Sequence, residues 1–181
     1  MNESVIIEFI KILLPAAAVL YAMYLTVKSF LNKEISHRMA DEKIKGVEMI
    51  LPVRLQAYER LSLLLERITP NNLILRLNDS NYSAKEFQQI LTFNVREEYN
   101  HNLSQQIYVG DQVWHLTTQA VEDVIATINQ AADGLPAEAR SIDLAKKAME
   151  VQVQKEISPI EQALVEVKKE VRLLFYNRQM I

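Results

Sequence analysis

The sequence is poor in the residues on which several protein classes depend. It has no cysteine, which excludes disulfides, thiolate metal sites, iron–sulfur clusters and a cysteine nucleophile. It has only three glycines in 181 residues, and because tight β-hairpins need glycine at positive φ, a β-sandwich or barrel is disfavoured. A net charge of −3 argues against the basic face of a dedicated nucleic-acid-binding protein. With 49% hydrophobic residues the chain has the composition of a folded protein, and we predict the all-α class.

One long uncharged run lies near the N-terminus. The sixteen residues Ile12–Val27 read ILLPAAAVLYAMYLTV and contain no charged side chain. As a helix this run spans about 24 Å, and extension back to Val5 gives about 35 Å, against a bilayer core of about 30 Å. We therefore predict a single transmembrane helix whose partner is the lipid bilayer, through residues 5–27.

The flanking charges predict the direction in which this helix crosses. Lys11 is the one cation before the run, whereas five Lys or Arg residues follow it between Lys28 and Lys45. Flanks rich in Lys and Arg stay in the cytoplasm, so we predict the N-terminus outside and the C-terminal domain in the cytoplasm.

Two other interpretations of the uncharged run stay open. A cleaved signal peptide is disfavoured because the small residues Ala16–Ala18 lie inside the run, and a buried core helix remains because the run is short for a membrane span.

The remainder of the chain is patterned as helices. Gly46 is expected to end a charged juxtamembrane helix, and Pro52 to begin the next helix. Further on, Thr69 is a capping residue before a proline and predicts a short helix through Leu77, and Ser83 with Glu86 forms a capping box before an apolar repeat of three to four residues. We predict four regions, which are an anchor (1–30), a juxtamembrane helix and linker (31–51), a helical bundle (52–135) and a C-terminal helical, coiled-coil-like segment (136–181).

The C-terminal segment has a heptad-like pattern. A helix is expected from about Ala137, and a second capping box, Ser158 to Glu161, precedes another helix. Apolar residues there step by three or four over three heptads, the spacing of a coiled-coil seam. The pattern does not decide whether the seam serves the chain's own bundle or self-association with a second copy. The seam consists of Val153, Ile157, Ile160, Leu164, Val167, Val171 and Leu174.

Two Glu-x-x-His pairs offer the sharpest catalytic hypothesis. In Glu34–His37 and in Glu98–His101 the two residues share one helical face, and paired motifs of this kind hold the di-metal centres of some helical bundles. The motif is short and the chain is rich in glutamate, so surface pairs are the favoured interpretation. The sequence contains neither a Gly-x-Ser-x-Gly elbow nor a glycine-rich phosphate loop. We therefore expect no metal, no cofactor and no enzymatic activity.

Three stretches carry a resemblance to a known kind of protein. They are FIKILLPAAAVLYAMYLTVKSF (Phe9–Phe30), RLQAYERLSLLLERITPNNLILRL (Arg54–Leu77) and EEYNHNLSQQIYV (Glu97–Val109). Together they resemble an uncharacterised family of small, single-pass, membrane-anchored proteins of unknown function from Gram-negative bacteria. The resemblance implies an inner-membrane protein with a cytosolic helical domain, and it implies no activity and no site residue.

The function predicted is that of a membrane-tethered helical scaffold or protein-interaction module. Amide and imidazole side chains concentrated in one helical stretch can bind the backbone of a partner, although they can equally cross-link the bundle. The alternative function is a membrane-bound bundle that holds a di-metal centre or a small ligand through the two Glu-x-x-His pairs. The candidate interaction surface consists of Asn100, His101, Asn102, Gln105 and Gln106.

Overall fold

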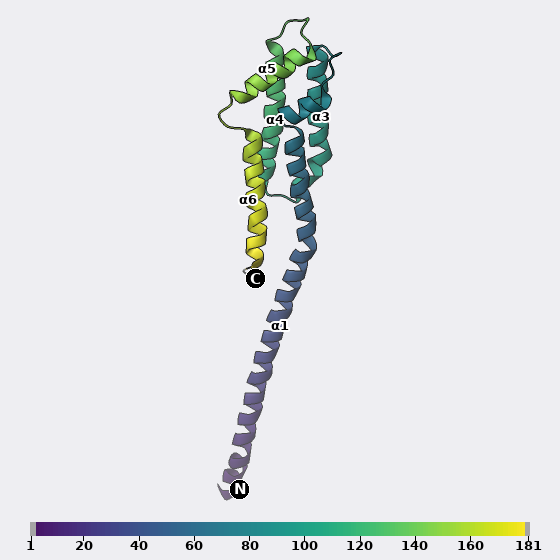
Figure 1. Ribbon diagram of the computed structural model, residues 1–181. Coiled ribbons are helices and arrows are strands. Elements are labelled where there is room, and N and C mark those ends of the chain that lie inside the picture. The colour runs from purple at the N-terminus through teal and green to yellow at the C-terminus, as the bar shows by residue number, and fades with distance from the viewer. Residues whose placement is uncertain (1–2, 180–181) are drawn as a thin grey trace. The chain divides into compact units, whose positions relative to one another are not determined.

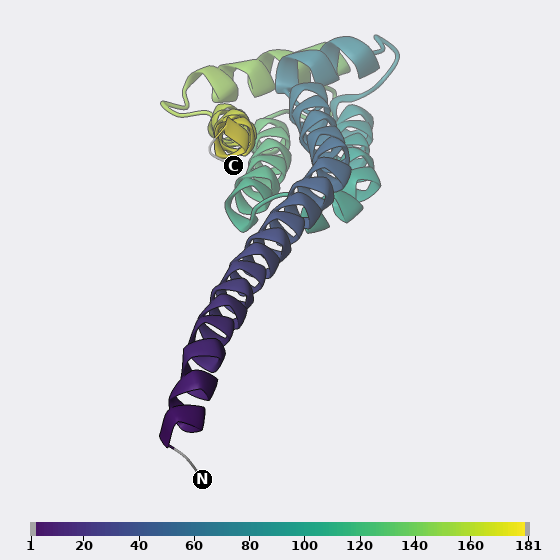
Figure 2. The same ribbon diagram turned by 90° about the horizontal axis from the view of Figure 1, so that it is seen from below.

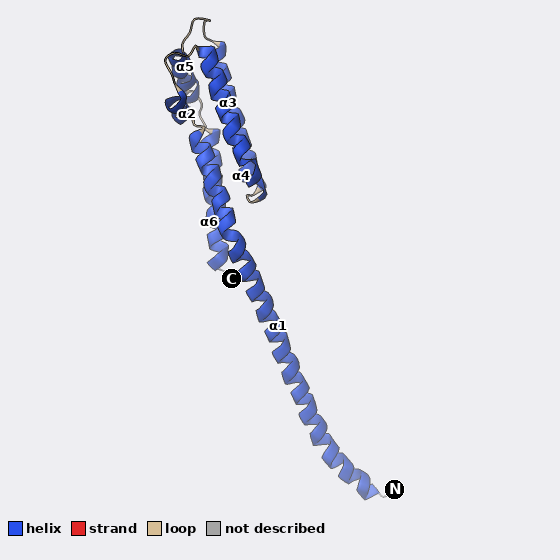
Figure 3. Ribbon diagram, turned by 90° about the vertical axis from the view of Figure 1, so that its right-hand side faces the viewer, coloured by secondary structure: helices blue, strands red, loops and turns tan. Residues whose placement is uncertain are grey.

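The computed structural model describes residues 3–179, and every regular element in that range is a helix (Figure 1). The side chains of residues 3–10, 12, 40–44, 47–48 and 177–179 are outside the description. The chain divides into two compact units, Met1–Met49 and Ile50–Ile181. The predicted all-α class is confirmed, and short loops join the helices of the second unit (Figure 3).

The first helix, α1, runs without interruption from Glu3 to Arg67. The prediction that Gly46 ends one helix and Pro52 begins another is therefore wrong. A glycine inside a helix costs only about 1 kcal/mol relative to alanine, and an interior proline costs about 3 kcal/mol. After Pro52 the side chains of Ala57, Tyr58 and Leu61 are buried, and each large apolar side chain buried contributes about 1.5–3 kcal/mol. Packing of the turns after Pro52 thus outweighs the local cost of the proline, whereas Gly46, which has no packed side chain around it, is accommodated at the small cost of a glycine in a helix.

The first unit contains the predicted membrane segment. Leu13–Met39 is long and apolar enough to cross a membrane, and none of it is buried within the chain. It is therefore not a core helix of its own chain, which removes one of the two open interpretations. The hydroxyl of Thr26 donates to the carbonyl of Ala22 at 2.9 Å, so this polar group has a partner inside the helix. The side chains of residues 5–10 and of Ile12, at the start of the predicted 5–27 span, lie outside the described residues.

The second unit is a helical bundle. Residues 50–67 of α1 pack with α3 (Ala84–Asn102), α4 (Asp111–Asp133) and α6 (Pro159–Gln179) around one core. Two shorter helices, α2 (Pro70–Leu77) and α5 (Ser141–Val153), lie across one end of these helices (Figure 2). A short 3-10 helix, η1 (Leu103–Ile107), follows α3. The core is apolar and includes Leu61, Leu65, Phe87, Leu91, Val113, Val124, Ile128, Leu144 and Val167.

The predicted caps at the start of α2 and α3 are confirmed. The hydroxyl of Thr69 accepts from the backbone N–H of Asn72, and Ser83 forms a capping box with Glu86. The Ser83 N–H and hydroxyl, both bonded to the Glu86 carboxylate, lower the pKa of Glu86. These bonds satisfy helix-end N–H groups that would otherwise depend on water.

The helix expected from about Ala137 begins only at Ser141. The backbone just before it is used in pairing with the segment that precedes α3. Ala84 donates to the carbonyl of Ala139 at 2.8 Å, and Ser141 donates to the carbonyl of Tyr82 at 3.0 Å. Because these groups bond across to another loop, they are not free to form the first helical turn.

The C-terminal seam is largely used inside the chain. Ile160 and Val167 are buried, and Leu164, Val171 and Leu174 pack against the same core. The other two seam positions, Val153 and Ile157, are 80% and 62% exposed because they flank the turn between α5 and α6. The heptad spacing thus serves α6 in its own bundle, and self-association through this segment stays a prediction.

Candidate functional site

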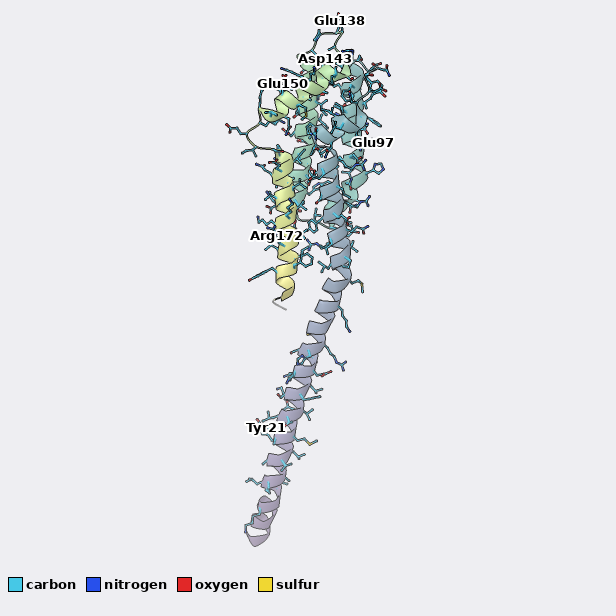
Figure 4. The ribbon with its side chains drawn as sticks, in the orientation of Figure 1. Tyr21, Glu97, Glu138, Asp143, Glu150 and Arg172 are labelled. Atoms are coloured by element: carbon cyan, nitrogen blue, oxygen red, sulfur yellow. The ribbon has the colours of Figure 1, made fainter. Side chains whose placement is uncertain are left out.

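The candidate site is a hollow of about 440 Å³ between the end of α1 and α3. On α1 the residues Arg60, Leu63 and Arg67 lie three and four positions apart, so they share one face of the helix. On α3 the residues Glu97 and His101 share a face in the same way, and Glu97 is labelled in Figure 4. Two helices therefore bring an arginine-bearing face and a glutamate-bearing face to one hollow. Its lining is Arg60, Leu63, Leu64, Arg67, Asn94, Glu97, Glu98, His101 and Asn102.

A second, smaller hollow extends the first towards α2. It measures about 270 Å³ and shares Leu63 and Arg67 with the first hollow. Its remaining lining, Glu66, Asn72 and Arg76, continues the mixed-charge surface. We call the two hollows together the charged groove. They form one surface over α1, α2 and α3.

Glu98 is the electrostatic centre of the charged groove. One of its oxygens contacts Arg67 at 2.6 Å and Arg76 at 3.2 Å. The Glu98 side chain is only 20% exposed, and this partial burial strengthens a charge-assisted contact. The cluster joins α1, α2 and α3 through one carboxylate, so Glu98 holds the walls of the groove together.

Three other charges in the groove are not used in this way. Arg60 and Glu97 line the same hollow, and both side chains are exposed. Among the residues that the structure describes, neither forms an ion pair. In the second hollow the exposed Glu66 likewise forms no ion pair among the described residues, so the groove presents one unpaired cation, Arg60, and two unpaired carboxylates, Glu66 and Glu97.

The predicted polar surface divides into exposed and buried members. Asn100, His101 and Gln106 are exposed, whereas Asn102 and Gln105 are buried. The Asn102 amide donates to the carbonyl of Glu98 at 2.8 Å, and His101 Nδ1 lies 3.1 Å from the carbonyl of Glu97. Of the five, His101 and Asn102 line the charged groove.

Sequence reasoning missed the groove's arginines. Arg60, Arg67 and Arg76 were not among the candidate residues selected from the sequence. The sequence offered little signal for them, because Arg60 and Arg67 bracket a single leucine, Leu63, and single apolar residues are common on helix surfaces.

The two Glu-x-x-His pairs fall on different units. Glu34 binds Arg38 at 2.9 Å in the first unit, and Glu98 binds Arg67 and Arg76 in the second. Within the described residues, no group of three His, Asp or Glu side chains is placed to hold a metal ion. Both carboxylates are engaged by arginine, so the structure adds nothing in favour of a di-metal site.

A second polar cluster lies within the bundle, between α1, α6 and the turn before α4. Arg54 donates to the carbonyl of Tyr108 at 2.9 Å and to the hydroxyl of Tyr58 at 2.8 Å, and it lies 3.4 Å from Glu170. The other Glu170 oxygen accepts from the N–H of Gly110 at 3.3 Å. Burial of Tyr58, followed by its hydrogen bond with Glu170, raises the pKa of Tyr58 to about 12. We call this group the Arg54 cluster, and its closed set of partners indicates a structural role.

The chain was compared with known proteins. Residues 4–174 match the profile of a family of unknown function, DUF7935. The chain belongs to this family. No curated protein and no solved structure matches it. The match includes both the apolar part of α1 and the charged groove, so both features lie within the part of the chain that defines family membership.

Proposed function

We propose that the protein is a membrane-tethered scaffold that binds a protein partner and catalyses no reaction. The observation that carries the proposal is the combination of Leu13–Met39, an apolar helical segment with no side chain buried in the chain, with a separately packed bundle. An apolar helix exposed all round needs an apolar surrounding, which a bilayer supplies. The bundle has its own core, so it does not need the anchor helix in order to fold.

The proposed topology places the N-terminus outside and the bundle in the cytoplasm of a bacterial inner membrane. Lys28, Lys33 and Arg38 follow the uncharged run, and positive flanks favour the cytoplasmic side. Tyr24 lies in the last turn of that run, and the Lys28 ammonium lies 5.8 Å from the centre of its ring. A tyrosine next to a lysine is typical of the interface between the bilayer core and the headgroups.

The charged groove is the proposed partner site. It offers the guanidinium of Arg60, the carboxylate of Glu97 and the exposed side chain of Leu63 in one hollow. Such a site fits a protein segment with an apolar side chain flanked by one acidic and one basic residue. Complementary charges on the groove would set the orientation of that segment more than its affinity.

The tether and its direction are tested with single cysteines, since the chain has none of its own. Ser4→Cys and Ser80→Cys report on the two sides of the span. In spheroplasts, a membrane-impermeant maleimide is expected to label Ser4→Cys and to reach Ser80→Cys only after the membrane is opened. Labelling of Ser80→Cys in intact spheroplasts would contradict the proposed topology. Release of the protein by alkaline carbonate would contradict the membrane tether.

The partner site is tested by photo-crosslinking in native membranes. A photoreactive amino acid at position 63 is expected to give a discrete adduct, and the same amino acid at the exposed position Ala126 on α4 is the matched control. Arg60→Glu should abolish the adduct, and a partner-side charge reversal should restore it. Equal adducts at both positions, or an adduct that is indifferent to Arg60→Glu, would contradict the groove assignment. An adduct with twice the mass of the chain would identify the partner as a second copy.

A further inference from the structure

The second half of α6 has two different faces. One face packs into the bundle core through Ala163, Val167 and Leu174. On the opposite face Val165, Leu173 and Tyr176 are 62%, 49% and 59% exposed. These residues recur at intervals that place them on one side of a helix, and Phe175, 47% exposed, lies beside them. Helix α6 therefore has apolar side chains on its solvent-exposed face as well as on the face that packs into the core.

The same outer face is basic. Lys168, Lys169 and Arg172 are exposed and alternate with its apolar residues, and Arg172 is labelled on α6 in Figure 4. The positions 165, 168, 169, 172 and 176 follow the helical period, so cations and apolar groups form one continuous strip. We call this strip, with Leu173 and Phe175, the outer face of α6.

Two acidic residues of this stretch are engaged by other groups of the chain. Glu170 bonds to the N–H of Gly110 and contacts Arg54, so it faces the Arg54 cluster. Glu166 is 23% exposed and contacts Lys169 at 3.0 Å, at the edge of the strip. Among the described side chains of residues 161–176, the outer face therefore contains three cations, of which Lys169 is paired with Glu166, and one exposed carboxylate, Glu161, at its N-terminal end, so cations exceed carboxylates.

We propose that the outer face of α6 binds the surface of a bilayer that contains anionic phospholipid. Lys and Arg are attracted to lipid phosphates, and leucine, phenylalanine and tyrosine side chains enter the interfacial region beside them. Long basic side chains can place their stems in the apolar layer and their charged ends among the headgroups. The charge pattern is therefore complementary to an anionic membrane surface.

The proposal rests on the proposed membrane tether, which also favours lipid over other occupants. A tethered bundle is always close to a bilayer surface, so a weak second contact forms at high effective concentration. An acidic protein or a second copy would have to be recruited. Single-chain membrane contact through three cations and a few apolar side chains is weak in the absence of a tether.

The test uses the full chain, one copy per nanodisc, with an environment-sensitive NBD fluorophore on Leu173→Cys. The discs contain phosphatidylcholine alone or phosphatidylcholine with phosphatidylglycerol. We expect a several-fold rise in emission, with a blue shift, in the anionic discs only. High salt should reverse the rise because it screens charges separated by more than about 3 Å at 1 M.

Matched charge variants separate this surface from net charge. Lys168→Gln, Lys169→Gln and Arg172→Gln together should abolish the rise. Lys85→Gln, Arg96→Gln and Lys146→Gln together remove the same charge from exposed positions on other helices and should preserve it. Loss of the rise in both triple variants would show that net charge alone is responsible and would overturn the proposal.

The remaining outcomes are also decisive. Equal emission in both kinds of disc overturns the proposal, and salt-sensitive crosslinks from Leu173 in native membranes would then assign the face to an acidic protein. A rise that needs two copies in one disc assigns the face to a second copy and likewise overturns it. Protein that fails to enter discs at all contradicts the membrane tether instead, so failure of the tether and failure of this inference are distinguishable.

Discussion

The two units of the chain differ in what surrounds their apolar side chains. In Met1–Met49 every described side chain is exposed, including Leu20 and Met23, whereas in Ile50–Ile181 apolar residues from all the helices meet in one core. The first unit has an uncharged run with no polar stripe, and the second has amphipathic helices. An amphipathic helix buries one apolar stripe against its neighbours, whereas a helix that is apolar all round needs an apolar surrounding on every side. The second unit is therefore stabilised by its own packing, whereas the described side chains of the first have no such packing within the chain.

The largest expected contrast is between neighbouring leucines in α1. Leu64 is 1% exposed and Leu63 is 55% exposed. Leu64→Ala should lower the free energy of unfolding of the bundle by about 2–5 kcal/mol, because it leaves a cavity in the core. Leu63→Ala should change it by less than about 1 kcal/mol. Urea unfolding of the full chain in detergent, followed by Trp114 fluorescence, measures both.

A substitution in the first unit completes that contrast. Leu20→Ala shortens an apolar side chain that has no buried contact within the chain. The bundle's unfolding free energy should stay at the value of the unsubstituted protein. A loss as large as that of Leu64→Ala would show that the apolar run packs against the bundle, and the comparison between the two units would fail.

The next expected effect is a loss of bundle stability at alkaline pH. The pKa of Tyr58 is raised to about 12 in the folded state from an ordinary value of 10, chiefly by burial and then by its bond with Glu170. Between these pH values the unfolded chain releases the phenol proton and the folded chain keeps it, so stability falls as pH rises. The loss should be on the order of 2 kcal/mol.

The matched variants are Tyr58→Phe and Tyr176→Phe. Unfolding free energies measured between pH 9 and 12 should fall less steeply for Tyr58→Phe than for the unsubstituted chain. Tyr176 is 59% exposed on α6, and its variant should follow the unsubstituted curve. Parallel curves for all three proteins would show that the Arg54 cluster does not hold the Tyr58 proton.

The caps and the interruptions expected in α1 show which parts of the fold follow from local sequence. Thr69 and Ser83 were recognised as caps because a capping side chain bonds within three residues of itself. The period of α6 likewise predicts its buried face. Gly46 was misread because one glycine costs too little to end a helix, and Pro52 because its larger cost is outweighed by burial of later residues against distant helices. A local pattern does not contain that contribution.

The candidate site was less predictable than the fold. His101 and Asn102 were selected as polar residues in one stretch, and both line the charged groove. Arg60 was missed because its partners in the groove come from α3, 34 or more positions away in the sequence. Asn102 and Gln105 are buried and bonded locally, which an exposed-surface interpretation does not anticipate. The residue types predict which chemical groups are available, but the packing of the helices decides which of them lie together in the charged groove.

A smaller effect is expected at the glycines of the second unit. A methyl group at Gly110 would lie 2.5 Å from Oε1 of Glu170, so Gly110→Ala must displace the carboxylate from the backbone N–H that it accepts from. We expect a loss of about 1–2 kcal/mol in unfolding free energy. Gly134 has no atom within 4 Å of an added methyl group, so Gly134→Ala is the control and should be close to neutral. Equal changes in unfolding free energy for Gly110→Ala and Gly134→Ala would show that the Glu170 carboxylate moves aside without loss of stability.

The smallest effect, opposite in sign, is expected at Gly46 in the first unit. An added methyl group there meets no atom within 4 Å, and the residue lies inside α1. Gly46→Ala should therefore stabilise the local helix by about 1 kcal/mol and slow amide hydrogen exchange around residue 46 by about fivefold. The measurement is exchange followed by mass spectrometry on the full chain in nanodiscs.

Gly46→Ala also distinguishes the continuous α1 of the structure from the helix break at Gly46 that was expected from the sequence. Ser36→Gly, in the same exposed part of the helix, should speed exchange around its own position and so provides the control of opposite sign. If Ser36→Gly responds and Gly46→Ala does not, residue 46 is not helical in the protein and the break expected from the sequence is present. If both respond, the helix continues through Gly46 without any tertiary contact to support it. In that case the glycine sites of the two units differ in sign, because a methyl group adds helix propensity in the first and displaces a bonded carboxylate in the second.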